Sequence, residues 1–156
     1  MTRPDPATWL AEAVVTRDLD RIRGDMAAGG TRINDARATV NAVRKVQADA
    51  PSFAIAGCHD AARKSITAHM VATGYRPKKG DGAHRIVIEY ARHVLGHVIT
   101  EADLDALDGL RRDRGDAEYG DFAQERFDQA HLDRAADLAE RIVNAVAADL
   151  AGSTKR

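Results

Sequence analysis

Apolar residues in this chain recur every three or four positions, and this period constrains the fold more than any other feature. The spacing places apolar side chains on one face of an α-helix, which must pack against other helices. Strands would need an alternation of period two, and no segment shows one that competes. The period therefore predicts an all-α fold, an antiparallel bundle of about five to six helices. Its clearest stripe, between Pro51 and Gly74, holds Ile55, Cys58, Ala62, Ile66 and Met70.

The first fifty residues are expected to form a pair of helices. Asp5 is a good N-cap, and Pro6 fits the first turn of the helix that follows. AAGG at 27–30 is expected to end this helix, because glycine weakens helices, and Thr31 is expected to cap the second one. The first stripe holds Val15, Leu19, Ile22 and Met26, and the second holds Ile33, Ala36, Val40 and Val43.

Residues 51–150 are expected to form the core of a single domain that spans 1–156. The segment GYRPKKGDG at 74–82 is rich in glycine and basic residues and predicts a loop. Gly115 and Gly120 predict a break or bend late in the fifth helix. The further helices are predicted over 83–98, from Thr100 onward, and over about 122–150.

Composition and charge limit the class of protein. The chain is 44% hydrophobic and 30% charged, as in a globular protein. Cys58 is the only cysteine, so we expect a reducing compartment, the cytoplasm. No run is long enough for a membrane span, and we expect no membrane association. The net charge of −1 argues against strong non-specific binding of nucleic acid.

The segment RRDRGDAEYG, residues 111–120, is the strongest candidate for a functional site. Leu107, Arg111 and Arg114 are spaced so that two guanidinium groups share the stripe of an apolar residue. A charge on such a stripe needs a partner. That partner is either an anionic ligand, because guanidinium matches phosphate oxygens, or a carboxylate of the chain. The candidate carboxylate partners are Asp108, Asp116, Glu118 and those of the last helix.

Three stretches, in order along the chain, resemble parts of one family. CHDAARKSITAHMVATGYRP at 58–77 resembles its long helix, which has a small-residue face and ends in a Gly-containing turn. GDGAH at 80–84 resembles its Gly/His entry to the next helix. LDGLRRDRGDAEYG at 107–120 resembles the stretch that carries its Arg-x(4–6)-His motif. The family is the HEPN domain superfamily of small helical proteins, and the likeness covers residues 52–150.

Carried over onto this chain, the motif arginine is Arg114, with Arg111 supporting it one turn earlier. Tyr119 stands where the family has histidine, and no histidine follows before His131. The resemblance implies metal-independent RNA cleavage, with arginine and histidine meeting across a homodimer interface. Arginine would stabilise charge on the phosphate while histidine moves a proton.

The tyrosine changes how the proton would be moved. Its reference pKa of about 10 makes it a poor base at neutral pH, although Tyr119 could donate a proton or hold the phosphate. Asp116 or Glu118 could act as the base if either lies within hydrogen-bonding reach. Arg111, Arg114, Asp116, Glu118 and Tyr119 are therefore the candidate catalytic residues.

Four residues are candidates for phosphate binding. Lys78 and Lys79 precede a predicted helix N-terminus, where backbone N–H groups attract anions. The segment lacks the GK[ST] ending of a P-loop, and a solvated basic turn is the alternative. His84 takes the Gly/His position of the resemblance, and Arg112 belongs to the arginine cluster.

Glu89, His93 and His97 share one face of the fourth predicted helix. This spacing would suit a metal site in a helical bundle, but packed histidines explain it as well, and we expect no metal or cofactor. Cys58 lies on an apolar stripe and is predicted to be a core residue.

We therefore expect an RNA-directed protein with a HEPN-like fold. As an enzyme it would be a metal-independent endoribonuclease of a toxin–antitoxin or defence system, acting as a homodimer. The alternative is a non-catalytic HEPN module that binds a nucleotidyltransferase-type partner protein, a nucleotide or RNA. A metal-binding bundle built on His93 and His97 is the third hypothesis.

Overall fold

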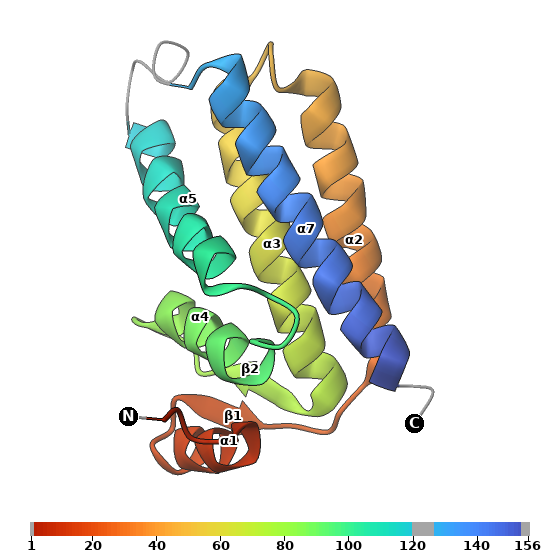
Figure 1. Cartoon of the computed structure of the whole chain (residues 1–156), viewed down its shortest axis with the longest axis vertical. Coiled ribbons are helices and arrows are strands. Elements are labelled where there is room, and N and C mark those ends of the chain that lie inside the picture. Colours follow the sequence, from red (N-terminus) through yellow and green to blue (C-terminus); the bar gives the residue numbers. More distant parts are fainter. Residues whose placement is uncertain (1, 120–126, 154–156) are drawn as a thin grey trace.

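A computed structural model describes residues 2–119 and 127–153 of the chain, with side chains except at 117–119. The predicted all-α bundle is confirmed. Figure 1 shows α2, α3 and α7 side by side, with α5 next to them and α4, α1 and a small two-stranded sheet at one end. No described helix combines the length and apolar character needed to cross a membrane. The elements are α1 (Pro6–Val15), β1 (Leu19–Arg21), α2 (Met26–Val46), α3 (Pro51–Thr73), β2 (Tyr75–Pro77), α4 (Ala83–Val94), α5 (Glu101–Tyr119) and α7 (Gln129–Ser153).

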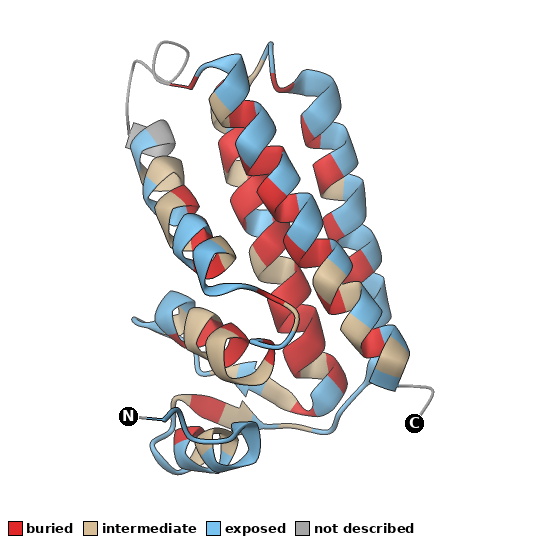
Figure 2. Cartoon of the chain, in the orientation of Figure 1, coloured by how far each residue is buried: buried red, intermediate tan, exposed pale blue. Residues whose placement is uncertain are grey.

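The central element is α3, which packs against α2, α5 and α7. Figure 2 shows it as the most continuously buried helix. Pro51 occupies its first turn, and Gly74 ends it in the left-handed conformation, at a φ of 103°. Both boundaries and the predicted stripe are confirmed, since Ile55, Cys58, Ala62, Ile66 and Met70 are all fully buried. This helix therefore organises the core.

Close packing of α2 on α3 explains why AAGG does not end a helix. A Cβ atom on Gly29 would lie 2.8 Å from Cβ of Ala72 and 2.9 Å from the backbone oxygen of Ala68. Glycine at this position lets the two helices approach closely, which outweighs its low helix propensity. The predicted helix end at 27–30 is therefore wrong. The cap is Asp25, which accepts from the Ala28 N–H, rather than Thr31.

A strand pair replaces the end of the first predicted helix. α1 stops at Val15, which is 81% exposed, and β1 pairs antiparallel with β2. Leu19, opposite Pro77, is buried against the core. The prediction of a loop without strands at 74–82 is wrong at Tyr75–Pro77, because the pairing depends on a segment more than fifty positions away.

The later helices differ from prediction at two places. α4 ends at Val94, before Val98, whereas Thr100 caps α5 as predicted by accepting from the Asp103 N–H. α5 continues through Gly115, so the predicted break of the helix at this residue is wrong, while the bend stays a prediction. This turn is held by Arg114, which contacts α3, and by Asp113, which contacts α7. The predicted start of the last helix near 122 and Gly120 lie outside the described residues.

Two neighbouring glycines in α2 provide a test of the helix packing. Gly29→Ala is expected to lower the free energy of unfolding by about 1–3 kcal/mol, because Ala72 and the Ala68 backbone cannot rotate away from the new methyl group. Gly30→Ala is expected to raise it by about 0.5–1 kcal/mol, since nothing lies within 4 Å of its added Cβ. Urea unfolding followed by circular dichroism measures both values. Equal effects of the two substitutions would contradict the close approach.

Candidate functional site

The arginine cluster of α5 meets α3 through Arg114. Its Nη1 lies 2.7 Å from Oδ1 of Asp60, and its side chain is 30% exposed. Arg111 is 47% exposed and points more toward solvent. The predicted inward stripe therefore holds for Leu107, which is buried, and in part for Arg114. Asp60 of α3 is thus a carboxylate partner of Arg114 that the sequence interpretation did not name.

His59 lies behind this ion pair. It is 3% exposed, and its Nδ1 lies 3.5 Å from Nη1 of Arg114, which can donate to it. Burial lowers the pKa of His59 to about 4; the charge of Arg114 lowers it further, and Asp60 acts in the opposite direction. The ring is therefore neutral at pH 7, and Nδ1 acts as an acceptor.

His84 stands in the first turn of α4 and faces His59, with ring centroids 5.9 Å apart. Burial lowers the pKa of His84, and the charges of Arg63, Arg111 and Arg114 lower it further. Unlike His59, His84 is exposed to solvent. The arrangement thus presents a neutral imidazole at the surface, beside several guanidinium groups.

Two cavities meet at His84 and Arg111. One is a narrow pocket of about 10 Å³ between α3, α4 and α5, which has room for about one water molecule. The other is an open cleft of about 500 Å³ between α4 and α5. Both residues line both cavities, whereas His59 lines only the pocket. Of these two cavities, only the cleft has room for a nucleotide-sized ligand, and His84 and Arg111 are among the groups that such a ligand can touch.

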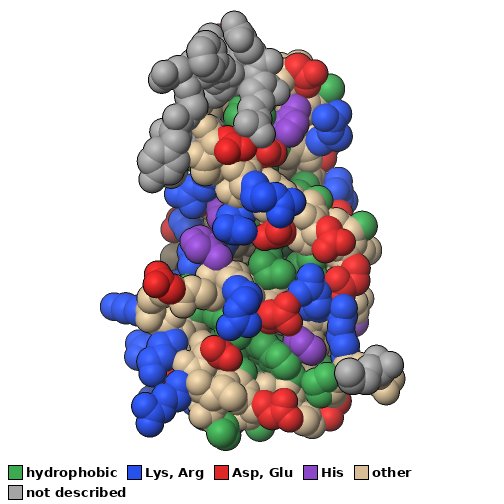
Figure 3. Space-filling view, turned by 90° about the vertical axis from the view of Figure 1, so that its left-hand side faces the viewer, with side chains coloured by type: hydrophobic (Ala, Val, Ile, Leu, Met, Phe, Trp, Pro, Cys, Tyr) green, Lys and Arg blue, Asp and Glu red, His purple; other side chains and the backbone are tan. Residues whose placement is uncertain are grey.

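Figure 3 views the face formed by α5 and the beginning of α4. Histidine side chains lie there among arginine and lysine side chains, with scattered carboxylates between them. The narrow pocket also receives Arg63, whose buried Nε has no hydrogen-bond partner among the described residues. A buried donor without a partner is costly, so this group is available to a water molecule in the pocket.

Arg111 can leave its present partner at little cost. Its Nε lies 3.2 Å from Asp108, which also accepts from Arg112 at 2.8 Å. All three side chains are at least 40% exposed, and exposed ion pairs contribute about 0–1 kcal/mol. Asp108 keeps Arg112 when Arg111 turns to another anion. Arg111 can therefore exchange Asp108 for a phosphate group that binds in the cleft.

The remaining predicted site residues are not gathered here. Arg112 is 66% exposed and pairs with Asp108, and Asp116 lies on the exposed surface of α5. Lys78 and Lys79 line a separate hollow before α4. The side chains of Glu118 and Tyr119 lie outside the described residues, so their predicted roles in proton transfer stay predictions.

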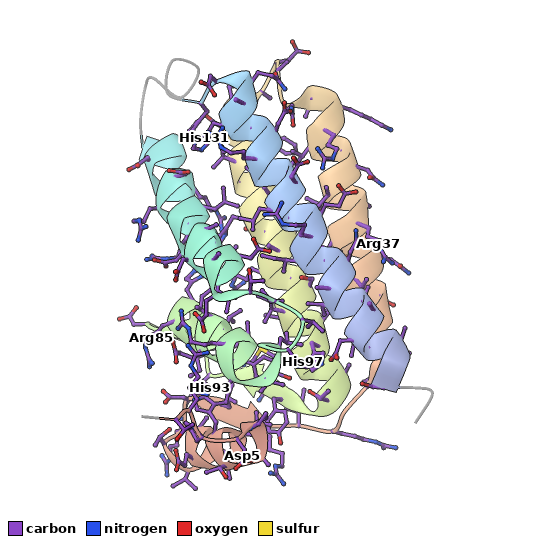
Figure 4. The ribbon with its side chains drawn as sticks, viewed as in Figure 1. Asp5, Arg37, Arg85, His93, His97 and His131 are labelled. Atoms are coloured by element: carbon purple, nitrogen blue, oxygen red, sulfur yellow. The ribbon has the colours of Figure 1, made fainter. Side chains whose placement is uncertain are left out.

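The histidines of the metal hypothesis have separate partners, and Figure 4 labels both. His93 stacks on Trp9 with ring centroids 4.8 Å apart. His97 lies 2.7 Å from Asp149, which also contacts the buried His69 at 2.9 Å. Among the side chains that the structure describes, no group of three or more His, Cys, Asp or Glu is arranged to hold a metal ion.

Cys58 is completely buried in α3, next to His59. Burial raises the pKa of its thiol to about 12, so the thiolate is not formed at neutral pH. The prediction that Cys58 is a core residue is confirmed.

The sequence interpretation missed the contribution of α3 to the site. His59 and Arg63 are spaced by four residues and share one face of an otherwise apolar helix, with Asp60 beside them. Polar residues at helical spacing inside an apolar helix are a usable signal, because they need partners. Which helix supplies those partners is visible only in the fold.

The arrangement supports chemistry on a phosphodiester. A neutral imidazole can accept a proton, and a guanidinium group can stabilise charge that develops on phosphate oxygens. His84 offers the imidazole from α4 and Arg111 offers the guanidinium group from α5, on the two sides of the cleft. His59, Arg63 and Arg114 form the layer behind them.

The family model described as HEPN domain matches residues 33–150, which run from α2 through most of α7. No curated protein and no solved structure matches the chain.

Acidification is expected to destabilise the fold through His59. Its pKa is about 4 in the folded chain, against an ordinary value of 6.5. Between these values the unfolded chain holds a proton that the folded chain lacks, so the free energy of unfolding falls as the pH falls. We expect a loss of about 2 kcal/mol between pH 7 and pH 5 from this residue.

Urea unfolding at the two pH values measures the loss. His59→Gln is expected to show a smaller loss, with a remainder from His69 and His84, whose pKa values are also lowered mainly by burial. An equal loss in the parent and the variant would contradict the assignment to His59.

Proposed function

Because the chain belongs to the HEPN domain family, whose members are generally RNA-related or nuclease-like, we propose that it is a metal-independent endoribonuclease. The observation that carries this proposal is the meeting of His84 and Arg111 at the cleft between α4 and α5. The histidine that the 111–120 segment lacks is supplied by a different helix. The toxin–antitoxin or defence setting is part of the proposal and rests on the family resemblance.

In the proposed reaction, neutral His84 accepts the proton of a ribose 2′-hydroxyl. The 2′-oxygen attacks the neighbouring phosphorus, and the bond from phosphorus to the 5′-oxygen breaks. His84 then returns the proton to the leaving 5′-oxygen, so the products are a 2′,3′-cyclic phosphate and a 5′-hydroxyl. Arg111 stabilises the negative charge on the phosphate oxygens during the attack.

The layer behind the cleft sets the protonation state of His84. Burial lowers its pKa most, and the charges of Arg63, Arg111 and Arg114 lower it further, which keeps the ring neutral and able to act as a base at pH 7. Arg114 is fixed by Asp60 at 2.7 Å. We therefore propose Arg114 as a positioning residue and Arg111 as the arginine that meets the substrate.

We also propose a homodimer, as the family resemblance implies. His84 and Arg111 already lie together within one chain, so a second subunit would bring two clefts together without having to complete either. Light scattering at micromolar concentration is expected to give twice the mass of the chain. A monomer that cleaves RNA would overturn the dimer and leave the site in place.

A non-catalytic HEPN module is the second candidate function. The observation in its favour is that arginines at the site already have carboxylate partners, such as Asp60 for Arg114 and Asp108 for Arg111. A surface of balanced charge suits a protein partner, here of the nucleotidyltransferase type, better than it suits free RNA.

RNA cleavage in excess EDTA tests the proposed function. The parent is expected to cut a mixed-sequence RNA, and His84→Asn to cut it about a hundredfold to ten-thousandfold more slowly, because the proton acceptor is lost. Arg111→Ala is expected to be slower by about a hundredfold or more. The products, resolved on a denaturing gel, should carry 2′,3′-cyclic phosphates.

His97→Asn is the matched control, because His97 is exposed and contacts Asp149 outside the cleft. It should cut at the parent rate. Equal rates for His84→Asn and the parent would remove His84 from the reaction. No cleavage by the parent would favour the non-catalytic module.

A further inference from the structure

A basic hollow lies beside the cleft, at the end of the molecule that carries the sheet of β1 and β2. It has a volume of about 120 Å³ and is lined by Arg17, Lys78, Lys79 and Arg85, with Asp18 and Asp81. Cations thus outnumber carboxylates there, although the chain as a whole has a net charge of −1. Figure 3 shows lysine and arginine side chains gathered at the lower edge of the site face.

The hollow is built on paired backbone. Two of its lining segments adjoin the strand pair: Arg17 and Asp18 precede β1, and Lys78 and Lys79 follow β2. The Lys78 N–H donates to the Asp18 carbonyl at 3.2 Å, which extends the pairing past Pro77. Arg17 adopts a left-handed conformation, with a φ of 64°, between α1 and β1. The two segments that carry the cations are therefore fixed relative to each other before any ligand binds.

Most of these cations have no carboxylate partner. Within the described residues, Arg17, Lys78 and Lys79 form no ion pair, and all three are exposed. Arg85 lies 3.7 Å from Asp18 and is 65% exposed, so this pair is weak. The arginines of the cleft, by contrast, are paired with carboxylates. Among the described residues, the hollow thus carries uncompensated positive charge.

The hollow and the cleft are continuous across the first turn of α4. Gly82 and Arg85 line both of them, and His84 lies between these two residues in sequence. Figure 4 shows Arg85 projecting from this end of α4. A chain of phosphates that occupies the cleft at His84 therefore meets the lysines of the hollow next.

We infer that the hollow binds the backbone phosphates of a single-stranded RNA whose scissile phosphate lies at His84. This inference rests on the proposed function and adds to it a substrate class, because RNA longer than the cleft is held at two places. Lys78, Lys79 and Arg17 contact phosphates, which carry no base information, so binding here is independent of sequence. The site then acts on extended RNA in preference to short fragments.

The experiment compares two charge-reversed variants. Lys78→Glu/Lys79→Glu changes the hollow, and Arg37→Glu/Lys45→Glu changes two exposed cations of α2 by the same total charge. Arg37 lies on the edge of the molecule opposite Arg85 (Figure 4). Fluorescence anisotropy measures binding of a labelled mixed-sequence single-stranded RNA long enough to reach from the cleft to the hollow. Cleavage of a dinucleotide, which fills only the cleft, is measured in parallel.

We expect the lysine variant to bind the long RNA about tenfold or more weakly and the control variant to bind it like the parent. In a plot of log affinity against log salt concentration, the slope for the lysine variant should be shallower than that of the parent by about 1.4. The reason is that each of the two lost phosphate contacts of a single strand contributes about 0.7. Dinucleotide cleavage by the control variant should match that of the parent.

Three outcomes would overturn the inference. Unchanged binding of long RNA by the lysine variant removes the hollow as an RNA surface, while dinucleotide cleavage by the parent still supports the cleft. Equal weakening in both variants shows a general effect of charge. Absence of RNA binding by the parent, with lysine-dependent binding to anionic lipid vesicles, assigns the hollow to a membrane surface. Failure of the proposed enzyme activity alone gives a different result from failure of this inference. In that case the parent leaves the dinucleotide uncut but still binds long RNA through Lys78 and Lys79.

Discussion

Burial of α3 between α2, α5 and α7 leaves the polar groups of its middle turns with few places to find partners. Gly57 lies so close to α2 that an added Cβ would be 2.6 Å from Val43, and this side of the helix excludes polar groups. His59 and Asp60 find their partner Arg114 on the side that faces α5 and the start of α4, where Arg63 lines the narrow pocket. The need to pair them brings Arg114 inward and defines where a site can form.

The same burial determines the electrostatics of the site. A buried imidazole resists protonation, and nearby guanidinium groups add to that resistance, so His59 and His84 both have lowered pKa values. His84 differs in reaching solvent, which makes it the histidine that a ligand can touch. The ion pair of Arg114 with Asp60 thus has two effects: it holds α5 against α3, and it keeps a fixed positive charge near the two rings.

The sequence predicted those parts of the fold that local spacing determines. The stripe of α3, its boundaries at Pro51 and Gly74, and the Thr100 cap follow from period and capping chemistry. The helix that continues through Gly29 and Gly30, and the pairing of β1 with β2, depend on segments distant in the chain. The site divides in the same way. Arg111 and Arg114 stand out in a short run. Their proximity to His59, more than fifty positions earlier in the chain, depends on the packing of α5 against α3.

The first turn of α4 links the two parts of the proposed RNA path. Consecutive helix residues point in directions about a quarter-turn apart or more, so His84 can face the α3–α5 layer while Arg85 reaches both the cleft and the hollow. Gly82, with a φ of 90°, precedes the turn in a conformation that favours glycine. The pairing of β1 with β2 fixes the backbone at Lys78, and ion pairs hold the side chains of α5 on the other side of the cleft. An RNA strand bound by Lys78 and Lys79 would therefore reach His84 within the first turn of α4. The proposed site would then need no histidine in the 111–120 segment itself.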